Sequence, residues 1–379
     1  MMRKPRLGGA DVARLHVLDL LRFVAAFSVL LYHYAFRGYA ADGYTVMPYL
    51  SLAGIAKYGF MGVNLFFLIS GFVVLMTASS NSLRHFVVSR VVRLYPAFWL
   101  CCTISYVTLL LWAHSPISLR HYLLNMTMLG DLFGVPSVDS VYWSLFVELK
   151  FYLLVSLAML SGQMRRVHVL LGIWLGVYVV NMIWPLRFVS FFLIPTYAPY
   201  FIAGATFYLM YREGRSLYKL SLLVSCFGLA GYQNALLLEG FALKYHAHLS
   251  KPLMWLVLVL FFATFWLIAS GRTGNFKRPS WLLLGAVTYP LYLIHQNIGY
   301  MLFNLGYTKL SPHFLLWGVT ASMFAAAYAV YRLEKLVAPP MKAALTRWLM
   351  LPERALRPRV STAELQSPAE IPGSVPSRP

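Results

Sequence analysis

Residues 17–36 read VLDLLRFVAAFSVLLYHYAF, an apolar run of 20 residues that contains three ionisable side chains. About 20 apolar residues form a helix long enough to cross a bilayer. Arg22 and His33 are 11 residues apart. Three α-helical turns take about 10.8 residues, so both side chains are predicted on one face, roughly 16 Å apart along the axis. Asp19 precedes Arg22 by three residues and is predicted to pair with it. Ionisable groups are costly inside a membrane helix, so this face is a candidate functional site.

The whole chain has the composition of a membrane protein. Of its 379 residues, 60% are hydrophobic and only 12% are charged, whereas a soluble domain carries about 25% charged residues. This excludes a soluble enzyme and a disordered protein. We predict an all-α, polytopic membrane helical bundle of about ten transmembrane helices, the first of which is retained rather than cleaved as a signal peptide. The other nine apolar segments are 58–78, 95–113, 142–160, 168–185, 191–211, 219–238, 252–270, 281–303 and 314–332.

The distribution of basic residues predicts the orientation of these helices. The formal charge is +20, but the basic residues lie mainly in the gaps between apolar segments, which indicates membrane topology rather than nucleic-acid binding. With the N-terminus in the cytoplasm, 23 Lys and Arg residues fall on the inner side and 7 on the outer side. Both termini are therefore predicted to be cytoplasmic. We divide the chain into an N-terminal segment (1–14), a transmembrane domain (15–335) and a basic, largely disordered tail (336–379).

Other polar residues within or beside the apolar segments are further candidates. Arg90 and Arg93 share a helical face and have the donors that bind phosphate, although basic residues at this position also signal topology alone. Glu148 shares a face with Ser144 and Tyr152. A further face carries Tyr289, Tyr292 and His295, where His295 either lines a cavity or packs. Gly62 and Gly71 allow close helix contacts. Cys101, Cys102 and Cys226 are predicted to be buried packing residues without a disulfide framework.

Two classes of function fit these residues. A transferase with an anionic donor needs a base such as His33 to take a proton from an acceptor, and arginines to hold phosphates. A proton-coupled transporter or flippase of a polar or anionic substrate would place the same residue types inside its helices. Composition and spacing leave both open. No ligand set for a metal is predicted.

The motifs resemble those of the integral-membrane acyltransferase family 3, the bacterial sugar O-acyltransferases, over roughly residues 15–335. Five family motifs occur in order, and the main departure is Leu94 in place of the usual isoleucine. They are R-x10-H from Arg22 to His33, G-V-x-L-F-F-x-I-S-G-F at 62–72, R-x-x-R-I-x-P at 90–96, W-S-L-x-x-E-x-x-F-Y at 143–152, and Y-x-x-Y-L-x-H at 289–295. The resemblance is to the stand-alone type without an added esterase-like domain.

This resemblance implies an O-acyltransferase in the bacterial cytoplasmic (inner) membrane. It implies transfer of an acyl group, most often acetyl, from cytoplasmic acyl-CoA to a carbohydrate hydroxyl, as in lipopolysaccharide or exopolysaccharide O-acetylation, with no permanently bound cofactor. His33 is then the catalytic base, and Glu148 orients it or the sugar. The donor is expected at Arg22, Arg90 and Arg93. The substrate is expected to contact Tyr152, Tyr292 and His295. Direct transfer and an acyl-histidine relay are both compatible with these residues, and the sequence does not indicate an oligomeric state.

Overall fold

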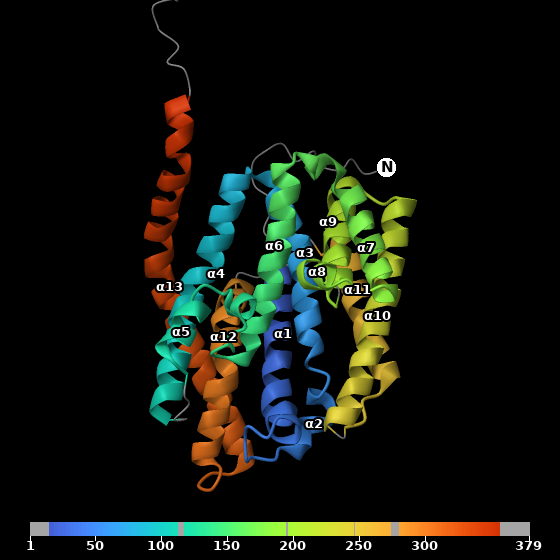
Figure 1. Cartoon of the computed structure of the whole chain (residues 1–379). Coiled ribbons are helices and arrows are strands. Elements are labelled where there is room, and N and C mark those ends of the chain that lie inside the picture. Colours follow the sequence, from blue (N-terminus) through green and yellow to red (C-terminus); the bar gives the residue numbers. More distant parts are fainter. Residues whose placement is uncertain (1–14, 113–116, 195, 246, 274–279, 357–379) are drawn as a thin grey trace, which may run out of the picture.

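The computed structural model describes residues 15–112, 117–194, 196–245, 247–273 and 280–356. All regular elements within these ranges are helices (Figure 1). Their bounds are α1 His16–Tyr32, η1 His33–Ala41, α2 Leu50–Ala56, α3 Met61–Ser80, α4 Leu83–Trp112, α5 Leu119–Asn125, η2 Gly130–Phe133, η3 Ser140–Tyr142, α6 Trp143–Leu160, η4 Gln163–Arg166, α7 Val167–Ile183, α8 Arg187–Phe192, α9 Ala198–Glu213, α10 Leu217–Tyr245, α11 Lys251–Ala269, α12 Ser280–Gly306 and α13 Pro312–Leu356.

The predicted polytopic helical bundle is confirmed. Each of the ten apolar segments falls on a helix, and in the described part of the chain eight helical stretches are long and apolar enough to cross a membrane. The other two segments fall on α9 and α12. The 16-residue α9 is short and is buried from Ala198 to Met210, and α12 carries buried polar groups such as Thr288, His295 and Gln296. Helices enclosed by other helices need no lipid-facing surface, so they can be short or polar.

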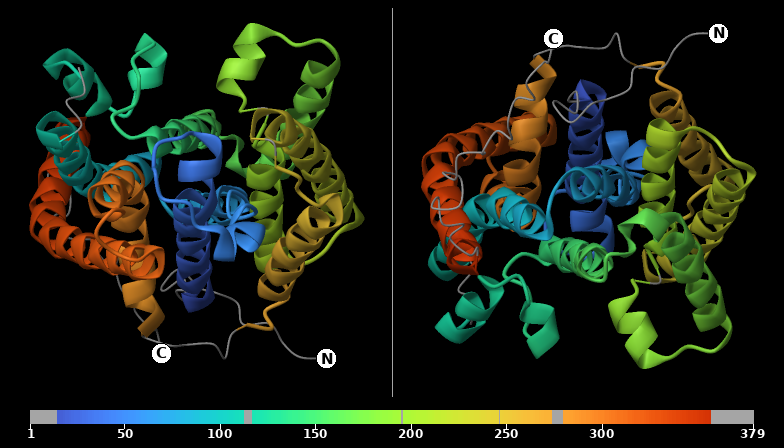
Figure 2. Two further views of the ribbon diagram at one scale, coloured as in Figure 1. Left: turned by 90° about the horizontal axis from the view of Figure 1, so that it is seen from below. Right: turned by 90° about the horizontal axis from the view of Figure 1, so that it is seen from above.

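The bundle is arranged around α1 and α3 (Figures 1 and 2). On one side of this pair lie α4, α12 and α13, and on the other lie α7, α9, α10 and α11. Glycine allows the close contacts, as predicted for Gly62 and Gly71. A Cβ on Gly62 would collide with the carbonyl oxygen of Ala25 in α1, and one on Gly71 with that of Phe201 in α9. Gly204 of α9 meets the backbone of α3 in the same way.

We call the end of the bundle at which α1 and α12 begin the inner end, because the sequence predicts that it faces the cytoplasm. Gly285 near the start of α12 touches the side chain of Asp19 near the start of α1. The helix α4 begins here at Leu83, so Arg90 and Arg93 lie on its first turns rather than in a loop. The three cysteines are buried and unpaired, as predicted.

The last helix, α13, continues past the predicted end of the transmembrane domain at residue 335. It has 45 residues, a length of about 68 Å, and it rises beyond the other helices in Figure 1. The predicted start of the tail at residue 336 therefore falls inside a continuous helix. Residues 1–14, the predicted N-terminal segment, and residues 357–379 of the predicted tail lie outside the described residues.

Candidate active site

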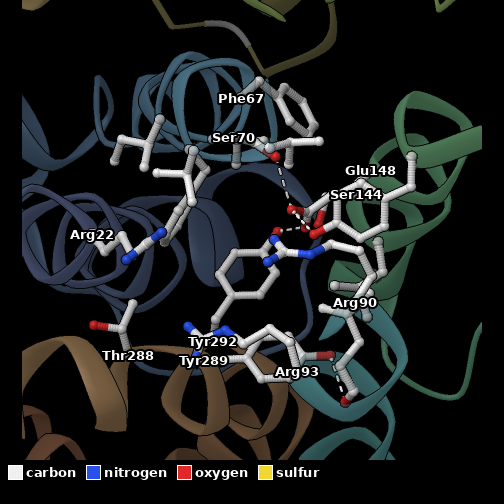
Figure 3. A pocket seen from close by; sticks show the side chains of 18 residues that line it. Arg22, Phe67, Ser70, Arg90, Arg93, Ser144, Glu148, Thr288, Tyr289 and Tyr292 are labelled. Atoms are coloured by element: carbon white, nitrogen blue, oxygen red, sulfur yellow. Dashed lines mark hydrogen bonds between the residues drawn. The ribbon is translucent and has the colours of Figure 1, made fainter. Parts of the chain in front are cut away.

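A cavity opens between α1, α3, α4, α6 and α12 (Figure 3). It holds about 790 Å³ of empty space, part of it open to the exterior. Six of the eight predicted site residues line this one cavity, although they come from four helices. These are Arg22 of α1, Arg90 and Arg93 of α4, Glu148 and Tyr152 of α6, and Tyr292 of α12.

Three guanidinium groups line the cavity: Arg22 from α1 on one side, and Arg90 and Arg93 from α4 on the other (Figure 3). Arg22 donates to Asp19 over 3.0 Å, which confirms the predicted pair. Arg90 lies between aromatic rings, with its guanidinium carbon 5.7 Å from the ring centroid of Tyr152, and Arg93 lies 5.9 Å from that of Tyr289.

The charges of Arg90 and Arg93 are not neutralised by a neighbouring carboxylate. Within the described ranges, neither residue has a carboxylate oxygen within the 4.0 Å of an ion pair. Both side chains line the cavity. Guanidinium groups that have no carboxylate partner and face an open cavity are suited to binding a phosphate, with which they form charge-assisted hydrogen bonds.

Glu148 is the acidic residue of the cavity. Its Oε1 accepts hydrogen bonds from Ser70 of α3 over 2.9 Å and from Tyr152 over 2.6 Å. The expected contact of Glu148 with His33 is absent from the hydrogen bonds of the described residues, and the ring partner of His33 is His295 instead. Glu148 therefore belongs to the arginine-lined cavity rather than to the histidine.

His33 lies where α1 passes into the π-helical segment η1. Its side chain is buried, and its Nδ1 is 3.0 Å from Nε2 of His295. Neither histidine is among the described residues that line the cavity. Tyr292 lines the cavity, its ring centroid is 5.8 Å from that of His295, and its hydroxyl is 2.8 Å from that of Ser144. Tyr292 is thus a neighbour of both the cavity and the histidine pair.

The pairing of His33 with His295 is the functional feature that sequence reasoning missed. The residues are 262 positions apart, and helical spacing relates only residues of the same helix. The signal that could have suggested it is that each histidine lies within an apolar segment, on a helical face that the sequence had already marked as a candidate. Ser70 was also missed, although it lies within one of the matched motifs.

Together these residues can bind an anion and transfer a proton. The arginines supply positive charge at the inner end, the glutamate accepts from hydroxyl or amide donors, and an imidazole is the side chain best suited to exchange a proton near neutral pH. The cavity and the histidine pair meet at Tyr292. The arginines therefore form a site for an anion, and the histidines form a site for proton transfer beside it. Two such sites in sequence suit a reaction on a long anionic substrate.

Comparison with known proteins agrees with this chemistry. A family model described as an acyltransferase domain matches residues 15–332. ORF330 of Acidianus two-tailed virus, provisionally named an acetyltransferase, is 24% identical over 323 residues, which cover 84% of this chain and 90% of that protein. YrhL of Bacillus subtilis, provisionally named a peptidoglycan O-acetyltransferase, is 30% identical over 167 residues, which cover 38% of this chain and 24% of that protein. No solved structure matches significantly.

The family match spans almost the whole transmembrane bundle, so the chain is a multi-pass membrane acyltransferase and belongs to acyltransferase family 3.

Proposed function

We propose that this acyltransferase moves an acyl group, in the simplest case acetyl, from cytoplasmic acyl-CoA to a hydroxyl of a cell-surface or exported carbohydrate, with His33 as general base. The observation that carries this proposal is one cavity that is lined by three arginines and by Tyr292, with the His33–His295 pair beside Tyr292. The relative named for O-acetylation of peptidoglycan supports a carbohydrate acceptor. In a bacterial cell the site of action is then the cytoplasmic membrane.

The donor is bound from the inner end. Arg90 and Arg93 hold phosphate groups of CoA, and the pantetheine arm continues past Arg22 toward Tyr292. Arg22 is 11 residues before His33, roughly 16 Å along α1, a gap that an extended arm can bridge. Both bonds of Glu148 go to Oε1, and in the described structure no hydrogen bond reaches Oε2. That oxygen is available to an amide N–H of the arm.

Transfer takes place at His33. Tyr292 turns aside, so that the thioester carbonyl reaches the acceptor hydroxyl beside the imidazole. His33 takes the hydroxyl proton while the acceptor oxygen forms its bond to the carbonyl carbon. The carbon–sulfur bond then breaks, and the CoA thiolate takes the proton back from His33. An acyl-histidine relay would use the same residue and the same two half-reactions.

The test is acylation by the purified protein in lipid vesicles. Radiolabelled acetyl-CoA and surface polysaccharide from the host are supplied, and label in the polysaccharide is followed for the native protein and for His33→Ala. We expect a loss of about 10²-fold or more in the variant, the contribution typical of a general base. A His33→Ala protein that inserts normally and still acylates at the native rate would overturn the assignment. Mass spectrometry of the host glycans identifies the group and the position modified.

A further inference from the structure

We infer that His295 is a positioning residue for His33. His295 accepts a hydrogen bond from Nδ1 of His33, and this leaves Nε2 of His33 as the base. The inference rests on the proposed function only in treating His33 as a base. The hydrogen-bond arrangement itself follows from the positions of four polar atoms. It also changes the role expected for His295, from substrate contact to control of the catalytic ring.

The direction of the hydrogen bonds follows from the far side of His295. Its Nδ1 is 2.9 Å from the carbonyl oxygen of Tyr292 and 3.2 Å from that of Leu291. Carbonyl oxygens only accept, so this Nδ1 carries the hydrogen. In the neutral ring the other nitrogen, Nε2, then has a lone pair and accepts. Nδ1 of His33, 3.0 Å away, must donate to it.

The consequence for His33 is a single tautomer. With its hydrogen on Nδ1, neutral His33 has its lone pair on Nε2, the atom pointing away from His295. Only the unprotonated nitrogen can take a proton from an acceptor, and the partner of the other nitrogen decides which one that is. In the other tautomer, two lone pairs would face each other across 3.0 Å, and the base would point into α12.

The helix α12 is held in place around His295 by several contacts. The carbonyl of His295 accepts from the Tyr34 hydroxyl over 2.6 Å, while its ring bonds to His33, so two successive residues of the chain hold His295. On the far side, the backbone N–H of Asn297 donates to the Asp139 carboxylate over 3.1 Å, and Ser140 donates to Gln296 over 2.8 Å. His295 is thus presented from a fixed length of helix.

A neutral partner suits this buried position. When Nε2 of His33 takes a proton, the ring becomes a cation, and its bond from Nδ1 to His295 becomes charge-assisted and stronger. His295 stabilises this cation without a second buried charge, which would be costly when His33 is neutral. In a serine-protease triad a buried aspartate carries out the corresponding task.

The kinetic test compares two variants of similar size. In His295→Gln the amide oxygen reaches the place of Nε2 and can accept, whereas His295→Leu has no acceptor. We expect His295→Leu to lose about 10² to 10⁴-fold in kcat with little change in the KM for acyl-CoA, and His295→Gln to recover at least tenfold of that loss. Equal losses in the two variants would show a packing role and overturn the inference. The matched control is His313→Gln, since His313 bonds Tyr49 at the outer end of the bundle.

The spectroscopic test reads the tautomer without any turnover. Protein labelled with ¹⁵N-histidine is placed in bilayers, and the His33 signals are identified by difference from His33→Gln. We expect a protonated Nδ1 and an unprotonated Nε2 on His33, and the opposite tautomer or a mixture in His295→Leu. A native His33 with its hydrogen on Nε2 would overturn the inference and leave the proposed function standing. Full acylation by His33→Ala would remove the proposed function, whatever the tautomer.

Discussion

At the scale of single residues, the cavity owes its chemistry to charges that remain available to a ligand. Arg90 and Arg93 rest against the rings of Tyr152 and Tyr289 instead of a carboxylate. Aromatic faces hold a guanidinium in place without using its N–H donors. Arg90 also donates long hydrogen bonds to the hydroxyls of Ser89, over 3.3 Å, and Thr77, over 3.4 Å. Glu148 is bonded to two neutral hydroxyls and, among the described residues, forms no ion pair. The opposite charges share one cavity without pairing, which leaves both for the substrate.

Replacement of Arg90 or Arg93 by glutamine is expected to raise the KM for acyl-CoA by about 10-fold to 100-fold, because each charged hydrogen bond contributes about 1.5–3 kcal/mol. The change in kcat is expected to be small. Initial rates with acyl-CoA and with acyl-pantetheine, which lacks the nucleotide phosphates, measure the effect. The KM for acyl-pantetheine should stay the same, and a parallel rise would refute phosphate binding. Arg212→Gln is the control, since Arg212 pairs with Glu213 outside the cavity.

Glu148→Gln is expected to lower kcat/KM by about 10-fold to 100-fold, because a charged acceptor within the cavity is lost. Tyr152→Phe removes one of its two hydroxyl donors and should have a smaller effect, about 10-fold or less. Steady-state rates of both variants over a range of donor concentrations give the two values of kcat/KM to be compared. If Tyr152→Phe were as damaging as Glu148→Gln, Glu148 would serve only to hold the tyrosine.

At the scale of helices, the sequence predicted which residues share a face but not which faces meet. Features that depend on one helix alone could be predicted. These are the apolar segments, the Asp19–Arg22 pair and the close contacts at the glycines of α3. The His33–His295 bond and the Ser70–Glu148 bond join helices that are distant in the chain. They depend on how α1, α3, α6 and α12 pack, which is decided by the shapes of many side chains together. The π-helical turn at His33 was also missed, because its backbone pattern has no periodic signature in the sequence.

The short segment before α6 is expected to stabilise α12. The buried Asp139 accepts from the backbone N–H groups of Val141 and Asn297. Asp139→Ala leaves both donors without this acceptor and should lower the free energy of unfolding by about 1–3 kcal/mol. Thermal unfolding in detergent measures this loss. Asp131→Ala, at an exposed position of the same region, is the control and should leave the transition unchanged.

At the scale of the whole molecule, the described helices form one multi-pass bundle. The helices α1 and α3 lie at its centre, with other helices on both sides (Figure 2). Of the two predicted residues on one face, His33 is buried and Arg22 lines the cavity. The basic residues concentrate toward the inner end, in keeping with the predicted topology. An anionic donor would meet this end first.

The predicted orientation can be read with single cysteines, because the three native cysteines are buried. Thr308→Cys lies between α12 and α13 at the outer end, and Ser216→Cys lies between α9 and α10 at the inner end. In sealed right-side-out vesicles, a membrane-impermeant maleimide should label residue 308 directly and residue 216 only after permeabilisation. The reverse pattern would invert the topology and move the arginine-lined cavity to the wrong side for cytoplasmic acyl-CoA.

The tyrosine beside the histidine pair has a consequence for the cell's energy supply. A tunnel open from end to end, lined by arginine and histidine, would let protons run down their gradient whenever no substrate filled it. Tyr292, bonded to Ser144 and packed against Phe66, lines the cavity beside His295. A side chain held in this way is suited to keep such a path closed at rest and to keep water away from a bound thioester.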